Sequence, residues 1–399
     1  MIAQDVGQRR AQDWYLAAAG VFAVGMAGTT LPTPLYGLYQ ERIGFSELMV
    51  TVIFAVYAFG VIAALLVAGD FSDVLGRRPV LLSALGLSVL SAGCFLGESG
   101  LPLLFAGRLL SGCAAGLFSG AATAAVLELA PPERRGQAAF AATAANMGGL
   151  GCGPLLSGFL AQYAPWPLRL PFLVHIALLA AAFAVTRALP ETVEPRTPRP
   201  PLRPQGMVVP QETRGAFVPA GLAAFAGFSV LGLFTAVAPG FLAQTLGEHD
   251  LAVTGLVVFS VFCSSTAGQF SMGRVGARRA LPTGCLVLTA GMAVVATSLL
   301  VESLPVLVVG AVGVGLGQGL AFRAALTSVS AVAPDERRGA TISAFFAVAY
   351  VGISLPVMGV GALTLALGLR GAGLVFAGCV MVLTATVGAY LLRRPLRTD

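Results

Sequence analysis

Long apolar segments follow one another along the whole chain, and only short polar breaks separate most of them. A helix needs about 20 mostly apolar residues to cross the core of a bilayer. Of the 399 residues, 57% are hydrophobic and 11% are charged, whereas a soluble domain carries about 25% charged residues. The sequence therefore predicts an all-α membrane protein with twelve transmembrane helices. The expected spans are residues 14–39, 48–69, 79–97, 102–127, 137–163, 171–189, 216–243, 251–273, 280–301, 304–332, 340–367 and 372–392.

The basic residues and the cysteines exclude several other classes of protein. The net charge is +6, but the 24 basic residues, all of them arginines, are scattered among apolar runs and form no patch for nucleic acid. Each cysteine lies in an apolar stretch and none has a C-x-x-C spacing, which excludes a disulfide framework and a zinc site. We expect no metal and no cofactor. The six cysteines are Cys94, Cys113, Cys152, Cys263, Cys285 and Cys379.

The placement of the arginines predicts the orientation in the membrane. If the N-terminus is cytoplasmic, nineteen of the 24 arginines fall on cytoplasmic segments, three on the opposite side and two within spans. The positive-inside rule then places both termini in the cytoplasm. The first apolar run is too long for the core of a signal peptide, so we expect it to be retained. The composition, rich in alanine, glycine and arginine, is typical of a GC-rich bacterial genome and favours a plasma (inner) membrane.

An internal repeat divides the expected spans into two sets of six. The segment APPERRG at 130–136 recurs as APDERRG at 333–339, a shift of 203 residues. At this shift two glycines of the fourth span, Gly112 and Gly116, fall on two glycines of the tenth. Chance recurrence of a polar loop is the alternative. The repeat predicts two pseudo-symmetric halves of six helices each, as in other membrane proteins built from parallel repeats.

The one long break in the apolar pattern lies between these halves. Residues 190–214 hold seven prolines and four arginines, a composition typical of an extended, solvated linker. We therefore expect an N-terminal half at 1–189, a cytoplasmic linker at 190–214 and a C-terminal half at 215–399.

Three short motifs lie on or beside the expected spans. They read GDFSDVLGRRP at 69–79, RLLSGCAAG at 108–116 and GLGCGPLLSG at 149–158. In order, they resemble the motifs G-x-L-x-D-x-x-G-R-[RK], R-x-x-Q-G-x-x-x-[AG] and G-x-x-x-G-P-x-x-G-G of the major facilitator superfamily, the third from its drug:proton antiporter branch. A serine replaces the usual glutamine in the second motif and one glycine in the third. The resemblance covers essentially the whole chain and implies a twelve-helix secondary transporter.

The first motif also has a physical interpretation of its own. Gly76 permits a tight turn, and Asp73 and Arg77, four residues apart, can pair. Glu128, at the end of the fourth span, offers a second carboxylate to the same arginine. The resemblance implies that this network latches the halves in the outward-facing state, with Asp73 near the start of span eleven; ordinary loop charge is the alternative. The matching segment GARR at 276–279 lacks the acid.

Glycines four residues apart favour close helix packing. In the fifth span, Pro154 also removes a backbone hydrogen bond, so this helix can bend at the interface between the halves. We expect a conformational role for Gly69, Asp73, Gly76, Arg77, Arg78, Glu128, Gly149, Gly153, Pro154 and Gly158.

Charged residues inside the membrane are costly unless they face water or a partner. Arg323 lies near mid-membrane and Arg108 nearer the opposite end of its span, whereas no aspartate or glutamate falls in the middle of any span. We interpret His175 as an interfacial or packed histidine rather than a proton carrier. The residues expected to form the path of substrate and protons are Arg108, Arg323, Thr33, Tyr36, Asn146, Gln318 and Phe322.

The sequence thus predicts a monomeric transporter whose partners are a small-molecule substrate, protons and the lipid bilayer. Proton-coupled efflux of a small organic or amphipathic compound is the main hypothesis, and proton-coupled uptake of a small organic anion is the alternative. An intramembrane enzyme is disfavoured because the chain has no H-E-x-x-H, no G-x-S-x-G and no carboxylate pair in the membrane. We expect no catalytic residue.

The two intramembrane arginines predict the sign of the substrate's charge. Arg323 stays protonated and no acidic residue lies at its depth in its own span. Together with Arg108 it would hold a positive potential that attracts an anionic substrate. The alternative is that Arg323 is structural, paired with backbone carbonyls, with Thr327 or Ser328, or with an acid from another helix.

Overall fold

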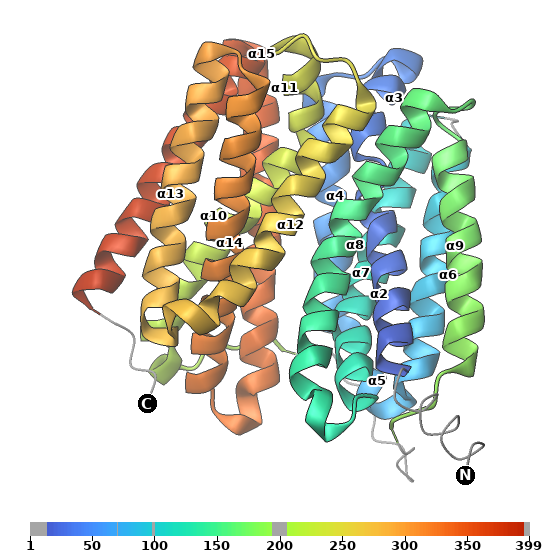
Figure 1. Ribbon diagram of the computed structural model, residues 1–399, viewed down its shortest axis with the longest axis vertical. Helices are drawn as coiled ribbons and strands as arrows, with labels where there is room; N and C mark the ends of the chain where they lie inside the picture. Colours follow the sequence, from blue (N-terminus) through green and yellow to red (C-terminus); the bar gives the residue numbers. More distant parts are fainter. Residues whose placement is uncertain (1–13, 70, 98–99, 194–205, 395–399) are drawn as a thin grey trace.

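The computed structural model describes residues 14–69, 71–97, 100–193 and 206–394, and the secondary structure of these residues is helical throughout. The helices form two bundles that stand side by side (Figure 1). In the N-terminal half the elements are α2 (Trp14–Thr30), η1 (Thr33–Leu35), α3 (Tyr36–Ile43), α4 (Glu47–Ala68), α5 (Phe71–Leu75), α6 (Arg77–Leu96), α7 (Leu101–Glu128), η2 (Pro132–Arg134), α8 (Arg135–Tyr163) and α9 (Leu170–Ala188). In the C-terminal half they are η3 (Gln211–Thr213), α10 (Arg214–Ala236), α11 (Ala238–Gln244), α12 (Leu251–Val275), α13 (Ala277–Val301), α14 (Leu304–Val332), η4 (Asp335–Arg337) and α15 (Arg338–Arg393).

Twelve crossings can be traced through the described residues. Ten helical stretches are long and apolar enough to cross a membrane, and α8, 29 residues long, adds an eleventh. The twelfth comes from α15, in which Gly368 has non-helical dihedral angles (φ 68°, ψ 173°) and separates two helices. The all-α membrane fold with two six-helix halves is therefore confirmed. The segment 194–205 of the expected linker lies outside the described residues.

The two halves meet along two pairs of helices. Helix α8 packs against α12, and α4 packs against α15. Inside the halves, α2 packs against α7 and α8, while α10 occupies the corresponding place against α14 and α15. This arrangement leaves α2, α7, α10 and α14 around the centre of the molecule.

Glycines allow helices within each half to approach closely at equivalent places. A Cβ atom on Gly112 of α7 would lie 3.0 Å from Cα of Gly60 on α4. A Cβ atom on Gly319 of α14 would lie 2.7 Å from the carbonyl carbon of Ser265 on α12. Because these neighbours are backbone atoms, they cannot move aside, and the packing interpretation of the repeated glycines follows from the structure.

Prolines interrupt a helix of each half in the same way. Pro154 inside α8 cannot donate to the carbonyl of Leu150, and the hydroxyl of Thr30 on α2 donates to that oxygen instead, at 2.7 Å. Pro356 inside α15 likewise frees the carbonyl of Gly352, which accepts a hydrogen bond of 2.9 Å from Ser229 on α10. In a membrane, a freed carbonyl needs such a partner.

Candidate functional site

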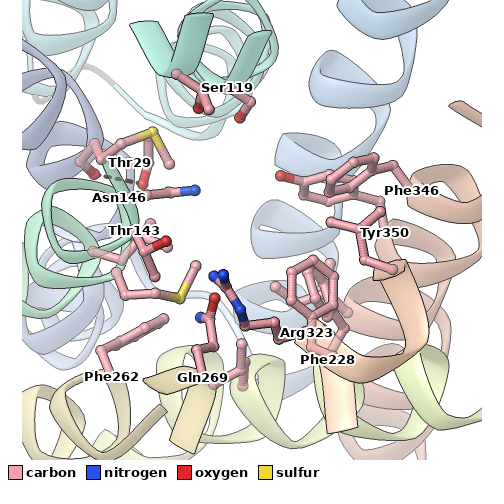
Figure 2. A pocket seen from close by; sticks show the side chains of 18 of the residues that line it. Thr29, Ser119, Thr143, Asn146, Phe228, Phe262, Gln269, Arg323, Phe346 and Tyr350 are labelled. Atoms are coloured by element: carbon pink, nitrogen blue, oxygen red, sulfur yellow. Dashed lines mark hydrogen bonds between the residues drawn. The ribbon is translucent and has the colours of Figure 1, made fainter. Parts of the chain in front are cut away.

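A cavity of about 530 Å³ lies between the two halves (Figure 2). Its walls come from α2, α4, α7 and α8 on one side and from α10, α12, α14 and α15 on the other. A volume of this size suits one small organic molecule. Its polar lining residues are Thr29, Thr30, Tyr57, Arg108, Ser119, Thr123, Thr143, Asn146, Thr235, Gln269, Arg323, Thr327, Ser330 and Tyr350.

The cavity extends toward the end of the molecule that carries η2 and η4. Leu127, Ala139, Ser330 and Ile342, which lie close to these short helices along the chain, are part of its lining. The structure thus has one closed and one accessible end.

Contacts between the halves close the opposite end. The hydroxyl of Tyr163 on α8 donates to Asp250 at the start of α12, at 3.1 Å. The amide of Gln244 on α11 donates to Glu47 at the start of α4, at 2.7 Å. These contacts tie the halves together where the cavity does not reach.

Arg323 carries a positive charge into this cavity. Its side chain extends from α14 toward the centre, beside Gln269 and across from Asn146 (Figure 2). Among the described residues no carboxylate lines the cavity, and the guanidinium group makes neither an ion pair nor a hydrogen bond with them. The hydroxyl of Thr327 donates to the backbone oxygen of Arg323, at 2.8 Å, and not to its side chain.

Arg108 lies in the wall of the cavity in a very different environment. Its side chain is 1% exposed, and its Nη1 donates to the backbone oxygen of Thr29 at 2.5 Å. The guanidinium carbon lies 5.0 Å from the ring centre of Phe54 and 4.7 Å from that of Tyr57. Arg108 is therefore held rigidly by one carbonyl and two aromatic rings.

Aromatic rings form one side of the cavity. Phe228 of α10 lies 5.3 Å from Phe322 of α14 and 5.6 Å from Tyr350 of α15, measured between ring centres. Tyr350 in turn meets Tyr57 of α4 across the two halves, at 6.3 Å. With Thr143 and Asn146 on the facing wall (Figure 2), the cavity has an apolar and a polar side.

Several expected path residues lie outside the lining of this cavity. Thr33 and Tyr36 are each 2% exposed, in η1 and at the start of α3. Gln318 is 1% exposed, and its Oε1 accepts a hydrogen bond of 2.6 Å from Ser265 where α12 approaches α14. Asn146 and Phe322 do line the cavity, as expected.

Other lining residues were not identified from the sequence. Phe54 and Tyr57 stand in the uniformly apolar run that forms α4, and nothing in that run marks the face that meets the cavity. Thr29, Thr143 and Gln269 are isolated polar residues in long spans. A search for every polar residue within a span would have found these three but not the two aromatic residues.

The first motif forms a compact network at the η2 end of the N-terminal half. Arg77 pairs with Asp73 and binds Glu128 through two nitrogens, at 2.8 and 3.1 Å. It also donates to the hydroxyl of Ser72 at 2.6 Å. The side chain of Asp73 is 60% exposed, and the hydrogen bonds of this network stay within the N-terminal half and the start of the linker.

Two linker residues join this network. The carboxylate of Glu191 accepts hydrogen bonds from the backbone nitrogens of Arg77 and Arg78, at 2.8 and 3.0 Å, and so caps α6. The hydroxyl of Thr192 donates to Glu128. The linker sequence gave no sign of this role, since a carboxylate that caps a distant helix has no local pattern.

The glycines around the network have distinct roles. Gly76 has φ +105°, a conformation that favours glycine, and a Cβ atom there would lie 2.6 Å from Oε2 of Glu191 and would displace this carboxylate. Gly69 is the C-cap of α4. Gly276, the counterpart in the second half, has φ +85°, so the turn is repeated there although the acid is not.

The third motif places α8 between its neighbours. A Cβ atom on Gly149 would lie 2.8 Å from Cβ of Met26 on α2, and one on Gly153 would lie 2.6 Å from the hydroxyl oxygen of Thr30. On another face of α8, Gly158 meets the backbone of Leu251 at the start of α12. The motif therefore lies at the contact between the halves.

Comparisons with known proteins agree with this geometry. The family model of the Major Facilitator Superfamily matches residues 17–355 and 219–399. An MFS-type transporter of Mycobacterium tuberculosis is 30% identical over 221 residues, which cover 52% of this chain and 31% of that protein. The tetracycline resistance protein, class E, of Escherichia coli is 29% identical over 161 residues, 40% of this chain and 38% of that one. The citrate-proton symporter of Klebsiella pneumoniae is 29% identical over 279 residues, 62% of each chain.

The matched stretches thus cover less than two thirds of these relatives' own length. Solved structures match more completely. A bacterial homolog of the human lysosomal transporter Spinster, in its inward-facing and occupied conformation, has a TM-score of 0.70 at 16% identity and covers 95% of this chain and 96% of that one. The human organic anion transporter MFSD10 (TETRAN) has a TM-score of 0.66 at 17% identity, covering 94% and 98%. With its family model matched across both halves, this chain belongs to the major facilitator superfamily.

Proposed function

We propose that this protein exports a small organic or amphipathic anion across the plasma membrane of a bacterium, by alternating access and in exchange for protons. The observation that carries the proposal is the charge of the central cavity. The unpaired guanidinium group of Arg323 extends into the cavity, and that of Arg108 adds a second positive charge in its wall. No carboxylate among the described lining residues neutralises these charges. A cation would be repelled from this site, whereas a carboxylate or a similar anion would find a bidentate partner.

The lining also favours an amphipathic substrate. Rings of Phe228, Phe322 and Tyr350 offer an apolar face, and Thr143 and Asn146 offer hydrogen bonds on the opposite wall. The names of two relatives support such a substrate, since one is a tetracycline resistance protein and the other is a citrate-proton symporter.

Export is preferred to uptake because of the third motif. Its Gly158 and the carbonyl of Pro154 lie where α8 meets α12, so a bend there would change the contact between the halves. The resemblance ties this motif to exporters. The citrate-proton symporter among the relatives supports the alternative, which is proton-coupled uptake.

The proposal includes the arrangement in the membrane. The halves at 1–189 and 215–399 rock against each other about the cavity, and the linker at 190–214 and both termini face the cytoplasm. The end with η2 and η4 is then the cytoplasmic end, and the structure corresponds to an inward-facing state. One chain contains the whole cavity, so a monomer suffices.

Two xanthene dyes of opposite charge test the charge and the direction together. Everted membrane vesicles that contain the protein are energised by respiration, and uptake of anionic fluorescein and of cationic rhodamine 123 is measured. We expect fluorescein to accumulate and rhodamine 123 not to. Arg323→Ala should lose fluorescein uptake by about tenfold or more, while Arg323→Lys should keep part of it, since the charge survives without the planar fork. Arg370→Ala, which removes an exposed ion pair with Glu302, is the matched control.

Two other outcomes would contradict the proposal. Accumulation in right-side-out vesicles instead of everted ones would assign uptake. A preference for rhodamine 123, with Arg323→Ala still fully active, would show that the arginine is structural.

The network around Arg77 provides a second test. We expect Asp73→Asn to reduce fluorescein export by about tenfold while leaving the protein inserted, because the network favours the outward-facing state through Asp73. Glu133→Gln, an acid on the neighbouring η2, serves as the control. Full transport by Asp73→Asn would remove the latch from the mechanism.

A further inference from the structure

A second, much smaller cavity lies inside the N-terminal half, away from the contact between the halves. It measures about 10 Å³, which is room for about one water molecule. Its lining comes from α2, α6, α7 and α9, and its polar members are Thr29, Ser88, Ser91, Ser111 and His175. We call it the histidine chamber.

His175 is buried in this chamber without a hydrogen-bond partner. The residue is 2% exposed, and neither Nδ1 nor Nε2 of its ring is hydrogen-bonded. The ring packs against Gly28 of α2, where an added Cβ atom would lie 3.1 Å from Cε1. A buried imidazole with two free nitrogens next to a water-sized space indicates an ordered water that bridges it to the surrounding hydroxyls.

The unpartnered polar atoms of the described residues concentrate in this region. Seven buried side-chain nitrogen and oxygen atoms lack a partner, and five of them belong to His175, Arg108 and Tyr36. Such a cluster is too large to be an isolated packing defect.

Thr29 connects the histidine chamber to the central cavity. This residue lines both spaces, and its backbone oxygen accepts the hydrogen bond from Arg108. A polar path therefore leads from His175, past Thr29 and Arg108, to the substrate cavity. The path begins at His175, the sixth residue of α9, near the closed end of the molecule.

The chain offers few other groups for a proton. Histidine is the side chain whose protonation ordinarily changes between about pH 5 and 8. The sequence contains two histidines, and His249 lies exposed in the loop before α12. No aspartate or glutamate lies in the middle of a span, and none lines either cavity in the described part of the chain.

Although its sequence context favours a packed histidine, its two unpartnered ring nitrogens lead us to propose that His175 is the proton-carrying residue of this transporter and that the histidine chamber is its hydrated access path. The inference rests on the proposed proton coupling. In the outward-facing state a proton from the external water binds to one ring nitrogen of His175 through that nitrogen's lone pair. In the inward-facing state the same proton leaves to water and passes along Thr29 to the central cavity, so the histidine returns to its neutral form.

The surroundings of His175 explain how binding is made reversible. The residues that face it from α2, α6, α7 and α9 are uncharged, and the nearest charge along the path is Arg108. A proton held there has no acid to retain it, and the positive charge of Arg108 favours its release.

Nitrogen NMR tests the site without any substrate. Protein labelled with ¹⁵N-histidine and carrying His249→Gln shows the signals of His175 alone, and His175→Asn shows which signals these are. We expect the imidazole nitrogens to titrate between about pH 3 and 8, toward the acidic part of this range because the site is buried and lacks an acid, and to exchange magnetisation with water. Ring signals of His175 that stay unchanged across this range would overturn the proposal.

Transport in proteoliposomes tests the coupling, with radiolabelled fluorescein as the probe. We expect His175→Asn to lower the accumulation driven by a pH gradient about tenfold. Exchange of labelled for unlabelled fluorescein at equal pH should stay within about twofold of wild type, because substrate binding is intact. His249→Gln should match wild type in both modes.

The two arms separate the failure of this inference from that of the proposed function. Gradient-driven accumulation at the wild-type rate in His175→Asn overturns the inference. So does an equal loss of both modes, which marks a structural role. If the wild type carries neither dye, the proposed function fails for these probes, and the NMR titration alone decides whether His175 binds protons.

Discussion

The two halves share their backbone design but not their charges. Each half has a proline inside one helix and satisfies the freed carbonyl with a hydroxyl from its first helix, Thr30 in one half and Ser229 in the other. Each also uses glycines to bring two helices together at equivalent places. The charged groups inside the membrane, in contrast, differ between the halves.

The intramembrane arginines show this difference most clearly. Arg108 in the N-terminal half is buried, bonded to Thr29 and covered by two rings. Arg323 in the C-terminal half is free and faces the cavity. The repeat shift of 203 residues places Ala311 where Arg108 would be and Gly120 where Arg323 would be. The glycines and prolines that both halves share thus maintain the helix packing, while the polar residues that are not repeated give each half a different function.

The repeated glycines offer the strongest test of the shared scaffold. We expect Gly112→Ala and Gly319→Ala each to lower the free energy of unfolding by about 3 kcal/mol or more, because the added methyl groups would collide with backbone of the neighbouring helix. Thermal unfolding in detergent measures the effect. Gly120→Ala on α7, where an added Cβ atom meets nothing within 4 Å, should leave stability unchanged. A large loss of stability from one of these two substitutions, with none from the other, would contradict the equivalence of the two halves.

Substitution of the two intramembrane arginines should affect the stability of the protein differently. We expect Arg108→Lys to cost about 2 kcal/mol, because lysine keeps the charge but loses the packing between the rings of Phe54 and Tyr57 and the geometry of the bond to Thr29. Arg323→Lys should leave the unfolding midpoint unchanged, since this guanidinium has no partner to lose. Equal destabilisation by both variants would contradict the distinction between a caged and a free arginine.

The hydroxyls that pair the freed carbonyls should give the smallest effects. Thr30→Val and Ser229→Ala each leave a buried carbonyl unpaired, and we expect each to cost about 1 kcal/mol. Thr297→Val on α13 is the control, because its exposed hydroxyl only donates to a carbonyl of its own helix. If Thr30→Val proved harmless while Ser229→Ala did not, the two prolines would differ in role despite their similar geometry.

Much of the fold could be predicted from the sequence because bilayer physics is restrictive. Apolar runs of spanning length must become helices, since no other open structure satisfies its backbone in lipid. The spans followed from this pattern, while the repeat and the resemblance to the family were recognised from particular polar and glycine residues. Even the break at Gly368 was expected between the last two spans, although the structure makes it with a single non-helical residue and not with a loop.

The residues that line the cavity could be predicted only in part. A helix that is apolar on every side gives no sign of which face meets the centre of the molecule. Phe54 and Tyr57 were therefore missed, while Thr33 and Gln318 were expected in the cavity but lie outside its lining. Asn146 and Phe322 do line the cavity, whereas Gln318, on the same helix as Phe322, faces α12 instead.

The sequence by itself determined the helices, their number, their repeat and the net positive charge within the membrane, because these depend on local composition and spacing. Only the tertiary structure decided what each polar group does there. It placed Arg108 between two rings, left Arg323 unpaired, joined Glu191 of the linker to the start of α6, and enclosed His175 among hydroxyls. The physical reason is that the role of a polar group in a membrane depends on its partners, and those partners come from helices far away in the chain.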